Sequence, residues 1–249
     1  MLAVAFEGCA CRAAFHVGVV EWLSERGMLP EAVAGASSGS LVAAAVALGR
    51  AGELREGWEA RLGLDIWQPG RVLRGRWPLT MSHVLREALR DHVGDVRLPD
   101  VPRPLAIAVT RLSRRGRVER VLTRSDDLPV AEAVAASSFL PGPYSRPTFV
   151  DRRPALDGAW QVRTPIAAAR ALGATRTLAC VSDEEGRLLG GFFRIRAFPV
   201  PADVAVLAPI EPLALRGFDF DPPRTRHAFA VGRRSAEAFV RAREEWLAG

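Results

Sequence analysis

The chain alternates short apolar runs with longer stretches in which apolar residues recur every three or four positions. Residues 2–6 form an apolar run, and residues 7–12 read as a turn. After that turn, four residues have the spacing of one helix face: Phe15, Val19, Trp22 and Leu23. Gly27 ends this pattern as a helix C-cap. The spacing therefore predicts a buried strand followed by a helix.

The same order recurs along the chain. Residues 32–34 predict a second strand, and a helix of small residues then runs through Leu48 and closes at Gly49. Residues 51–95 are mostly helical in pattern, with a looser segment at residues 66–80 whose proline, glycine and tryptophan indicate a surface loop. The remaining pattern predicts strands at residues 105–110, 118–123, 148–150, 155–156, 177–181 and 204–207, and helices at residues 130–136, 165–172 and 225–247.

This alternation of strands and helices favours an α/β sandwich. A chain of 249 residues, 49% of them hydrophobic, is long enough for one large domain over residues 1–249. No stretch approaches the ~20 apolar residues of a membrane span. Glu7 and the absence of a basic flank make the first residues unlike a secretory signal. The expectation is a cytoplasmic protein.

The formal net charge is +6, and every basic side chain is an arginine because the sequence contains no lysine. The densest run lies in the predicted hairpin of residues 105–123: Arg111, Arg114, Arg115, Arg117, Arg120 and Arg124. Such a run is either a solvated hairpin or a surface that attracts anionic lipid. No nucleic-acid partner is expected, since no base-reading motif accompanies the charge.

The three cysteines predict neither a disulfide scaffold nor a zinc site. Cys9 and Cys11 flank one residue in the predicted turn, whereas Cys180 lies in a predicted buried strand. Their number is odd and their spacing lacks the paired C-x-x-C of zinc sites. Reduced thiols and no bound metal are expected.

One pentapeptide carries candidate chemistry. Gly35-Ala36-Ser37-Ser38-Gly39 fits G-x-S-x-G in a single frame, with Ser37 at its centre between a predicted strand and a predicted helix. A nucleophilic serine on such a turn adopts a strained backbone, and flanking glycines remove the Cβ clashes. The amide end of the helix then points toward the reacting oxygen. Small residues feeding a helix would also give this pattern.

A nucleophilic serine needs a base, and the histidines are poor candidates. An α/β-hydrolase order of Ser37, Asp157 and His227 can be written, but that fold places several strands before its nucleophile and only two are predicted here. The histidines read as structural or solvated groups: His16 packed in the first helix, His83 and His92 nine residues apart with no metal-ligand spacing, and His227 solvated in the last helix.

Three further segments resemble the patatin-like phospholipases. GCACRA at residues 8–13 is similar to the family's G-G-G-x-R-G turn, and AVAASSFLPG at residues 133–142 to its A-S-x-x-x-P segment. Asp157-Gly158-Ala159 looks like the D-G-[GA] motif. With the serine pentapeptide these matches keep the family order over about two-thirds of the chain. The resemblance implies a three-layer α/β/α sandwich of patatin type with a central, mostly parallel sheet.

The resemblance also implies a Ser–Asp dyad without histidine. Ser37 would be the nucleophile and Asp157 the general base, with a basicity raised by partial desolvation. The oxyanion would be held by the backbone amides of Cys9 and Ala10, together with the turn at Ser38. Gly158 would support the loop that carries the aspartate.

The chain departs from the family in the glycine-rich turn, where only Gly8 and Arg12 match G-G-G-x-R-G. Side chains at Cys9 and Ala10 can distort or narrow the oxyanion hole, and loss of one donor costs ~10²–10³ in rate. Arg12 either braces this turn through carbonyl groups or binds a lipid phosphate.

The resemblance implies an acyl hydrolase that cleaves carboxylic esters of lipids, as a phospholipase A or lipid esterase does, through an acyl-serine intermediate and without a cofactor. The alternatives are a thioesterase or acyltransferase, and a catalytically weak or inactive protein that binds lipid or a partner. Five aromatic residues either fill a core or form an interfacial lid: Trp67, Trp77, Phe192, Phe193 and Phe198. Peripheral contact with an anionic membrane surface is therefore a further expectation.

Overall fold

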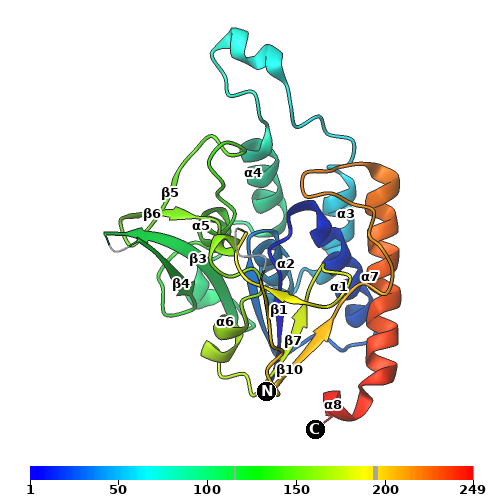
Figure 1. The fold of residues 1–249 in the computed structure, drawn as a ribbon. Coiled ribbons are helices and arrows are strands. Elements are labelled where there is room, and N and C mark those ends of the chain that lie inside the picture. Colours follow the sequence, from blue (N-terminus) through cyan, green and yellow to red (C-terminus); the bar gives the residue numbers. More distant parts are fainter. Residues whose placement is uncertain (115, 193–195, 249) are drawn as a thin grey trace.

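The computed structural model describes residues 1–114, 116–192 and 196–248, and an eight-stranded sheet lies at its centre (Figure 1). Its strand order is β10-β7-β1-β2-β3-β6-β5, with β4 paired to β3. The strands from β10 to β3 are parallel, whereas β4, β5 and β6 run antiparallel to their neighbours. The bounds are β1 (Leu2–Phe6), β2 (Ala32–Ala36), β3 (Leu105–Ser113), β4 (Gly116–Leu122), β5 (Thr148–Val150), β6 (Arg153–Leu156), β7 (Arg176–Cys180) and β10 (Val204–Leu207).

Helices cover both faces of this sheet (Figure 1). Four of them pack on one face: α1 (Ala14–Glu25), α2 (Ser38–Ala47), α5 (Val130–Ser137) and α7 (Pro222–Ala242). The short helix α6 (Ile166–Ala171) packs on the other. Successive strand residues point to opposite faces, so β1 directs Val4 and Phe6 to the first face and Ala3 and Ala5 to the second. The fold is the predicted three-layer α/β/α sandwich with a mostly parallel sheet.

Most predicted elements are present, with differences at their ends. The predicted helix over residues 225–247 is wrong at both ends, because α7 begins at Pro222 and a separate helix, α8 (Glu244–Ala248), follows it. The Asp221 side chain accepts a hydrogen bond from the Arg224 N–H at 2.9 Å, and this N-cap starts α7 three residues earlier. Two strands without a sequence signal, β8 (Leu188–Leu189) and β9 (Ala197–Phe198), form a small separate sheet.

The region predicted as mostly helical contains α3 (Leu54–Glu59) and α4 (Met81–His92). Between them, residues 64–80 project away from the body of the molecule with the short 3-10 helix η3 (Pro69–Arg74) at the tip (top of Figure 1). The other 3-10 turns are η1 (Ala10–Ala13), η2 (Ala51–Glu53), η4 (Leu98–Asp100) and η5 (Gly158–Trp160).

The arginine-rich hairpin forms from β3 and β4, and much of its charge is balanced within the molecule. Arg111 and Arg120 both pair with Asp151, at 2.7 and 3.2 Å. The Arg117 guanidinium lies 5.3 Å from the centre of the Trp160 ring. Arg115 lies outside the described residues. Arg111 and Arg120 are therefore less available to an anionic lipid surface than unpaired arginines would be.

Two further observations concern membrane-spanning helices and the cysteines. No helix in residues 1–114, 116–192 and 196–248 is long and apolar enough to cross a membrane. Cys9, Cys11 and Cys180 are all free and buried. Their thiols are therefore shielded from solvent.

Candidate active site

Ser37 lies at the sharp turn between β2 and α2. Its backbone has φ 51° and ψ −130°, a left-handed conformation that a residue with a side chain adopts only under strain. The two flanking glycines are required by close packing. A Cβ at Gly35 would lie 2.4 Å from the Gly39 carbonyl oxygen, and one at Gly39 would lie 2.4 Å from the Phe6 carbonyl oxygen. The pentapeptide therefore forms the strained elbow that its spacing predicted.

Asp157 follows β6 and meets Ser37 side chain to side chain. Ser37 Oγ donates to Asp157 Oδ2 at 2.5 Å, and the Ala159 N–H donates to Oδ1 at 2.8 Å. The carboxyl group is fully buried. Burial raises the pKa of Asp157 to about 7, although the hydrogen bonds from Ser37 and Ala159 act in the opposite direction. Near neutral pH this carboxylate can both take up and release a proton.

A second serine holds the elbow in place. The Ser37 N–H donates to Ser137 Oγ at 2.9 Å, and Ser137 Oγ donates to the Ala108 carbonyl oxygen at 2.7 Å. Ser137 comes from the end of α5, in the segment at residues 133–142 that carried the family resemblance. The motif was visible in the sequence, but the contact of Ser137 with the Ser37 amide was not.

The loop after β1 approaches the elbow because Phe6 of β1 is in register with Gly35 of β2. Gly8 is packed tightly here, since a Cβ on it would lie 2.6 Å from Ala159 Cβ and 2.9 Å from Ser37 Cβ. Gly158 is equally close to the β3 backbone: a Cβ on it would lie 2.1 Å from the Ala108 carbonyl oxygen. These glycines let the three loops meet.

The backbone N–H groups of Cys9 and Ala10, which were predicted to face the oxyanion, differ in their hydrogen bonding. The Cys9 N–H donates to Ser38 Oγ at 3.2 Å, so a side chain already occupies it. The Ala10 N–H has no protein acceptor within the part of the chain that the structure describes. Ala10 has φ 52°, and alanine is strained at this angle whereas glycine is not. The departure from the glycine-rich turn is thus accommodated by strain at Ala10.

The comparisons with known proteins match this arrangement of loops and sheet. The model of the family described as patatin-like phospholipase matches residues 4–170. The chain belongs to this family. The match covers the loop after β1, the serine elbow and the segment with Asp157, and it confirms the resemblance found in the sequence.

Among solved structures, the patatin-like chain is similar to VipD from Legionella pneumophila, with a TM-score of 0.60 and 12% identity over 97% of this chain and 66% of that chain. It is also similar to the type III effector protein ExoU, with a TM-score of 0.51 and 14% identity over 98% of this chain and 53% of that one. The chain spans only about half to two-thirds of the length of these proteins. At these identities the likeness concerns the fold.

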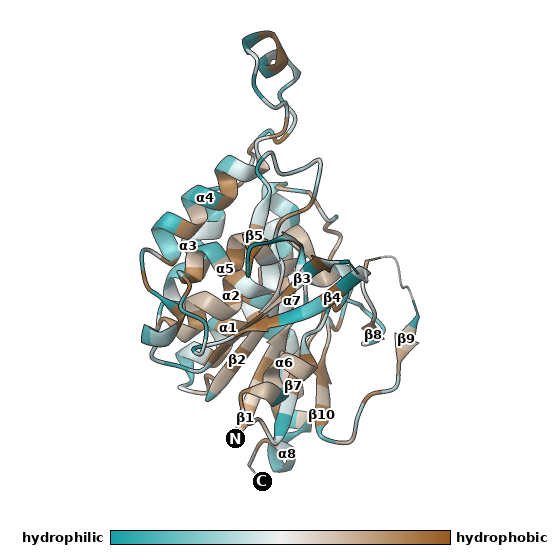
Figure 2. Cartoon of the chain, turned by 90° about the vertical axis from the view of Figure 1, so that its left-hand side faces the viewer, coloured by the Kyte–Doolittle hydropathy of each residue, from teal (hydrophilic) through white to brown (hydrophobic). Residues whose placement is uncertain are grey.

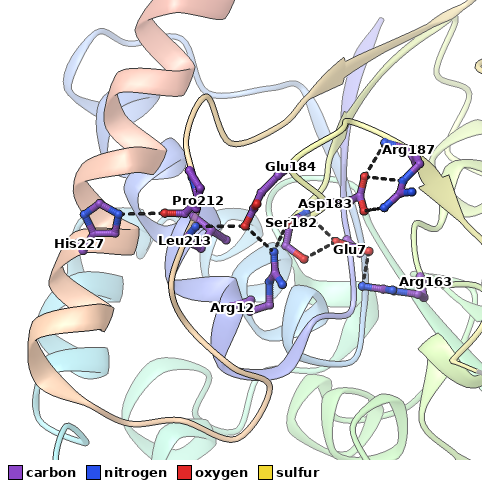
Figure 3. Close-up of polar contacts among 10 residues, drawn as sticks. All are labelled: Glu7, Arg12, Arg163, Ser182, Asp183, Glu184, Arg187, Pro212, Leu213 and His227. Atoms are coloured by element: carbon purple, nitrogen blue, oxygen red, sulfur yellow. Dashed lines mark hydrogen bonds and ion pairs between the residues drawn. The ribbon is translucent and has the colours of Figure 1, made fainter.

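A buried charged network supports the loop after β1 in this patatin-like chain (Figure 3). Glu7 is fully buried; its Oε1 pairs with Arg163 at 2.7 Å, and its Oε2 accepts the N–H and Oγ–H of Ser182 at 2.6 and 2.8 Å. The Arg12 guanidinium donates to the Ser182 carbonyl oxygen and lies 3.7 Å from Glu184. Arg12 therefore braces the loop, the first of the two roles considered for it.

No histidine contacts the Ser37–Asp157 pair within the described residues. His16 is packed between the rings of Phe6 and Phe15, and burial lowers its pKa to about 3. His227 lies on α7, where its ring is within 3.0 Å of the Pro212 carbonyl oxygen, and His83 lies on α4, 3.5 Å from Glu87. The order Ser37, Asp157, His227 is therefore not a triad in this fold.

One group of side chains has the composition of a metal site. The ligand atoms of Glu7, Cys9 and His16 lie within 4.8 Å of one another in the interior. Both Glu7 oxygens already have protein partners, however, and Arg163 supplies the compensating positive charge. Burial and the nearby Glu7 raise the pKa of the Cys9 thiol far above its ordinary value, which disfavours the thiolate that binds metal. The cluster fits a packed ion pair better than a cation.

Ser37 and Asp157 open onto a cavity of about 480 Å³. Its wall is mostly apolar and comes from α3, α4 and three loops: Leu54, Trp58, Met81, Val84, Leu85, Ala88, Leu140, Tyr144, Phe192, Phe218 and Phe220. Phe192, one of the predicted lid residues, is part of this wall, whereas Phe198 is exposed and Phe193 lies outside the described residues. An apolar cavity of this kind suits a hydrocarbon chain.

The cavity also contains two polar groups that sequence analysis missed. Tyr144 is the chain's sole tyrosine, and burial and the charge of Asp157 raise the pKa of its hydroxyl. Ser138, whose side chain is buried, lines the same cavity. Both belong to the loop after α5, and only the A-S-x-x-x-P resemblance pointed to this loop.

Proposed function

We propose that this patatin-like chain is a serine acyl hydrolase that cleaves carboxylic esters of lipids, as a phospholipase A or lipid esterase does. The observation that carries the proposal is the 2.5 Å hydrogen bond from the strained Ser37 to the buried Asp157, beside an apolar cavity. Membership of the patatin-like phospholipase family supports the same reaction class.

In the proposed reaction, Asp157 accepts the Ser37 proton as Oγ attacks the ester carbonyl carbon. The charge that develops on the carbonyl oxygen is stabilised by the N–H groups of Cys9 and Ala10 and by the turn at Ser38. The ester C–O bond then breaks, and Asp157 returns the proton to the leaving alcohol. A water molecule next gives a proton to Asp157 and attacks the acyl-serine carbonyl carbon. The bond from this carbon to Ser37 Oγ then breaks, Asp157 returns the proton to Oγ, and the carboxylic acid is released.

The environment of Asp157 supports its role as a direct base. A carboxylate with a pKa of about 7 is far more basic than an exposed aspartate, and a general base works best with a pKa near the operating pH. No step in this scheme needs a metal or an organic cofactor.

The occupied amide of Cys9 and the strain at Ala10 favour a second candidate: a catalytically weak or inactive chain that binds lipid or a partner. A substrate oxygen reaches the Cys9 N–H only after the Ser38 hydroxyl turns away. Thioester hydrolysis and acyl transfer would use the same acyl-serine, and activity on acyl-CoA compared with glycerolipids separates them from ester hydrolysis.

We also infer that residues 1–249 act as one domain, since one sheet contains both β1 and β10 from opposite ends of the sequence. The proposed place of action is the cytoplasm, with peripheral contact at an anionic membrane surface where the lipid substrate is found.

The test is hydrolysis of p-nitrophenyl butyrate and octanoate by the wild type, Ser37→Ala and Asp157→Asn, with folding checked by circular dichroism. Both variants should lose at least about 10³-fold in kcat/KM. Ser125→Ala and Asp127→Asn, which change exposed turn residues, are the matched controls and should keep full activity. Activity that survives Ser37→Ala would contradict the proposal. An inactive wild type whose Ser37 does not react with a fluorophosphonate would support the binding protein.

A further inference from the structure

The segment of residues 64–80 exposes several large apolar side chains to solvent. It projects from the body of the molecule, and its tip carries hydrophobic residues (top of Figures 1 and 2). Five large apolar side chains along it are exposed: Leu64, Trp67, Val72, Leu73 and Trp77. Leu73, in η3 at the tip, is 92% exposed. A local concentration of exposed apolar groups of this size marks an interaction surface.

The same segment carries a net positive charge, with three arginines and one acid, Asp65. Arg71, Arg74 and Arg76 lie in it, and residues 66–80 contain no aspartate or glutamate. None of these arginines forms an ion pair within the described part of the chain, and the Arg71 Nε–H donates to the Trp77 carbonyl oxygen. Arg111 and Arg120 of the β3–β4 hairpin, by contrast, are paired with Asp151. Arg71, Arg74 and Arg76 therefore remain available to an anionic partner, whereas Arg111 and Arg120 do not.

The backbone of the segment is ordered by its own hydrogen bonds. The Gln68 N–H donates to the Pro78 carbonyl oxygen at 2.9 Å, and the Thr80 N–H donates to the Ile66 carbonyl oxygen at 3.0 Å. The two sides of the segment thus form a paired stem that holds η3 away from the body. The apolar tip is presented outward rather than folded onto the core.

The stem is joined directly to the wall of the active-site cavity. Met81, the first residue of α4, follows the stem and lines the cavity. Trp77 Nε1 donates to the Gly142 carbonyl oxygen at 2.7 Å, so the stem also contacts the loop whose Leu140 and Tyr144 are in the same wall. The segment is therefore continuous in the chain with one wall of the cavity and hydrogen-bonded to another.

We propose that residues 64–80 dock the molecule on an anionic lipid bilayer, with Leu73 and Val72 inserted among the lipids and Arg71, Arg74 and Arg76 at the headgroups. Tryptophan, arginine and exposed leucine together are the composition that favours the bilayer interface. The three unpaired arginines select a negatively charged surface over other apolar partners. This inference rests on the proposed function for its substrate, but the docking itself needs no catalysis.

The test measures co-sedimentation of the wild-type protein with vesicles of ether-linked phosphatidylcholine, pure or mixed with ether-linked phosphatidylglycerol. Ether lipids contain no carboxylic ester, so the measurement does not depend on hydrolysis. The protein should bind the mixed vesicles, bind the neutral ones much less, and dissociate as salt is added. Arg74→Gln/Arg76→Gln should weaken binding about 30-fold, from the contribution of two arginines at the surface. Leu73→Glu, at an exposed position that does not affect folding, should weaken it at least about tenfold.

Two matched controls make the same kinds of substitution at exposed positions outside residues 64–80. Arg226→Gln/Arg243→Gln removes two exposed arginines, and Phe149→Glu places an acid at another exposed apolar position; both should bind as the wild type does. Equal binding by the tip variants and the wild type would overturn the proposal, as would salt-independent binding to neutral vesicles. A dimer in sedimentation velocity that Leu73→Glu dissociates, without vesicle binding, would overturn it in favour of self-association. Vesicle binding by a protein without esterase activity would contradict the proposed function and leave the docking intact.

Discussion

At the scale of single residues, the proposed reaction depends on a carboxyl group that the fold keeps away from water. Asp157 is fully buried, and its pKa is about 7 because the charged form loses hydration. Because burial raises its pKa, Asp157 stays protonated at pH values where an exposed aspartate is already ionised. A protonated Asp157 cannot act as a base.

The pH profile of esterase activity should report this group. We expect kcat/KM to fall about tenfold for each pH unit below about 7 and to reach a plateau above it, because only the ionised Asp157 can take the Ser37 proton. The measurement is hydrolysis of p-nitrophenyl butyrate from pH 5 to pH 9, with circular dichroism at each pH. An activity that stays constant down to pH 5 would mean that Asp157 is not the base.

Ala10 supplies a second test at this scale. Its left-handed φ of 52° strains an alanine, whereas a glycine adopts this angle freely. Ala10→Gly should therefore raise the free energy of unfolding by about 1 kcal/mol, as measured by urea denaturation. Ala131→Gly, within helix α5, is the control and should lower it by about 1 kcal/mol. A destabilised Ala10→Gly protein would show that the loop is not strained there.

At the scale of elements, the sequence predicted well wherever one local pattern determines the structure. The apolar run of β1 and the helix face that contains Phe15 and Val19 both depend on neighbours within a few residues. The start of α7 was missed because its signal is the cap at Asp221 and not an apolar period. Strands β8 and β9 have two residues each, too few for any period to show.

The alanines of β1, β2 and α6 let this helix pack closely against the sheet, and this close packing can be tested. Ala168 is fully buried against strand alanines that include Ala3 and Ala5, so α6 lies close to the sheet. Ala168→Leu should lower the free energy of unfolding by about 1–3 kcal/mol, since the sheet must move to admit the extra methyl groups. Ala167→Leu, at the neighbouring exposed position, should change it by less than about 0.5 kcal/mol. Equal effects in urea denaturation would show that α6 is loosely packed.

At the scale of the whole molecule, the candidate site draws on loops after β1, β2, α5 and β6. Ser37, Asp157 and the loop after β1 could be predicted because each has its own short motif. The contact of Ser137 with the Ser37 amide could not, because it depends on how α5 sits against the sheet. The ion pair of Glu7 with Arg163 was also invisible, since no local spacing relates two residues so far apart in the chain.

The ion pair of Glu7 with Arg163 joins the loop after β1 to the segment that follows η5. We therefore expect its removal to destabilise the protein. Glu7 is fully buried, so Arg163→Met should leave its charge without compensation and lower the free energy of unfolding by about 2–3 kcal/mol. The two hydrogen bonds from Ser182 remain and limit the loss. The double variant Glu7→Gln/Arg163→Met should recover at least half of it, since no buried charge is then left.

The matched control is Arg170→Met, which breaks the exposed pair of Arg170 with Asp203 and should cost less than about 1 kcal/mol. Urea denaturation of the wild type, Glu7→Gln, Arg163→Met and the double variant forms a double-mutant cycle for Glu7 and Arg163. If Arg163→Met and Arg170→Met cost the same, or if the double variant is the least stable, the buried pair does not hold the loop. If the cycle behaves as expected, the ion pair of Glu7 with Arg163 positions the loop after β1. Ester hydrolysis by Arg163→Met should then fall even where the protein remains folded, because the amides of Cys9 and Ala10 lose their fixed position.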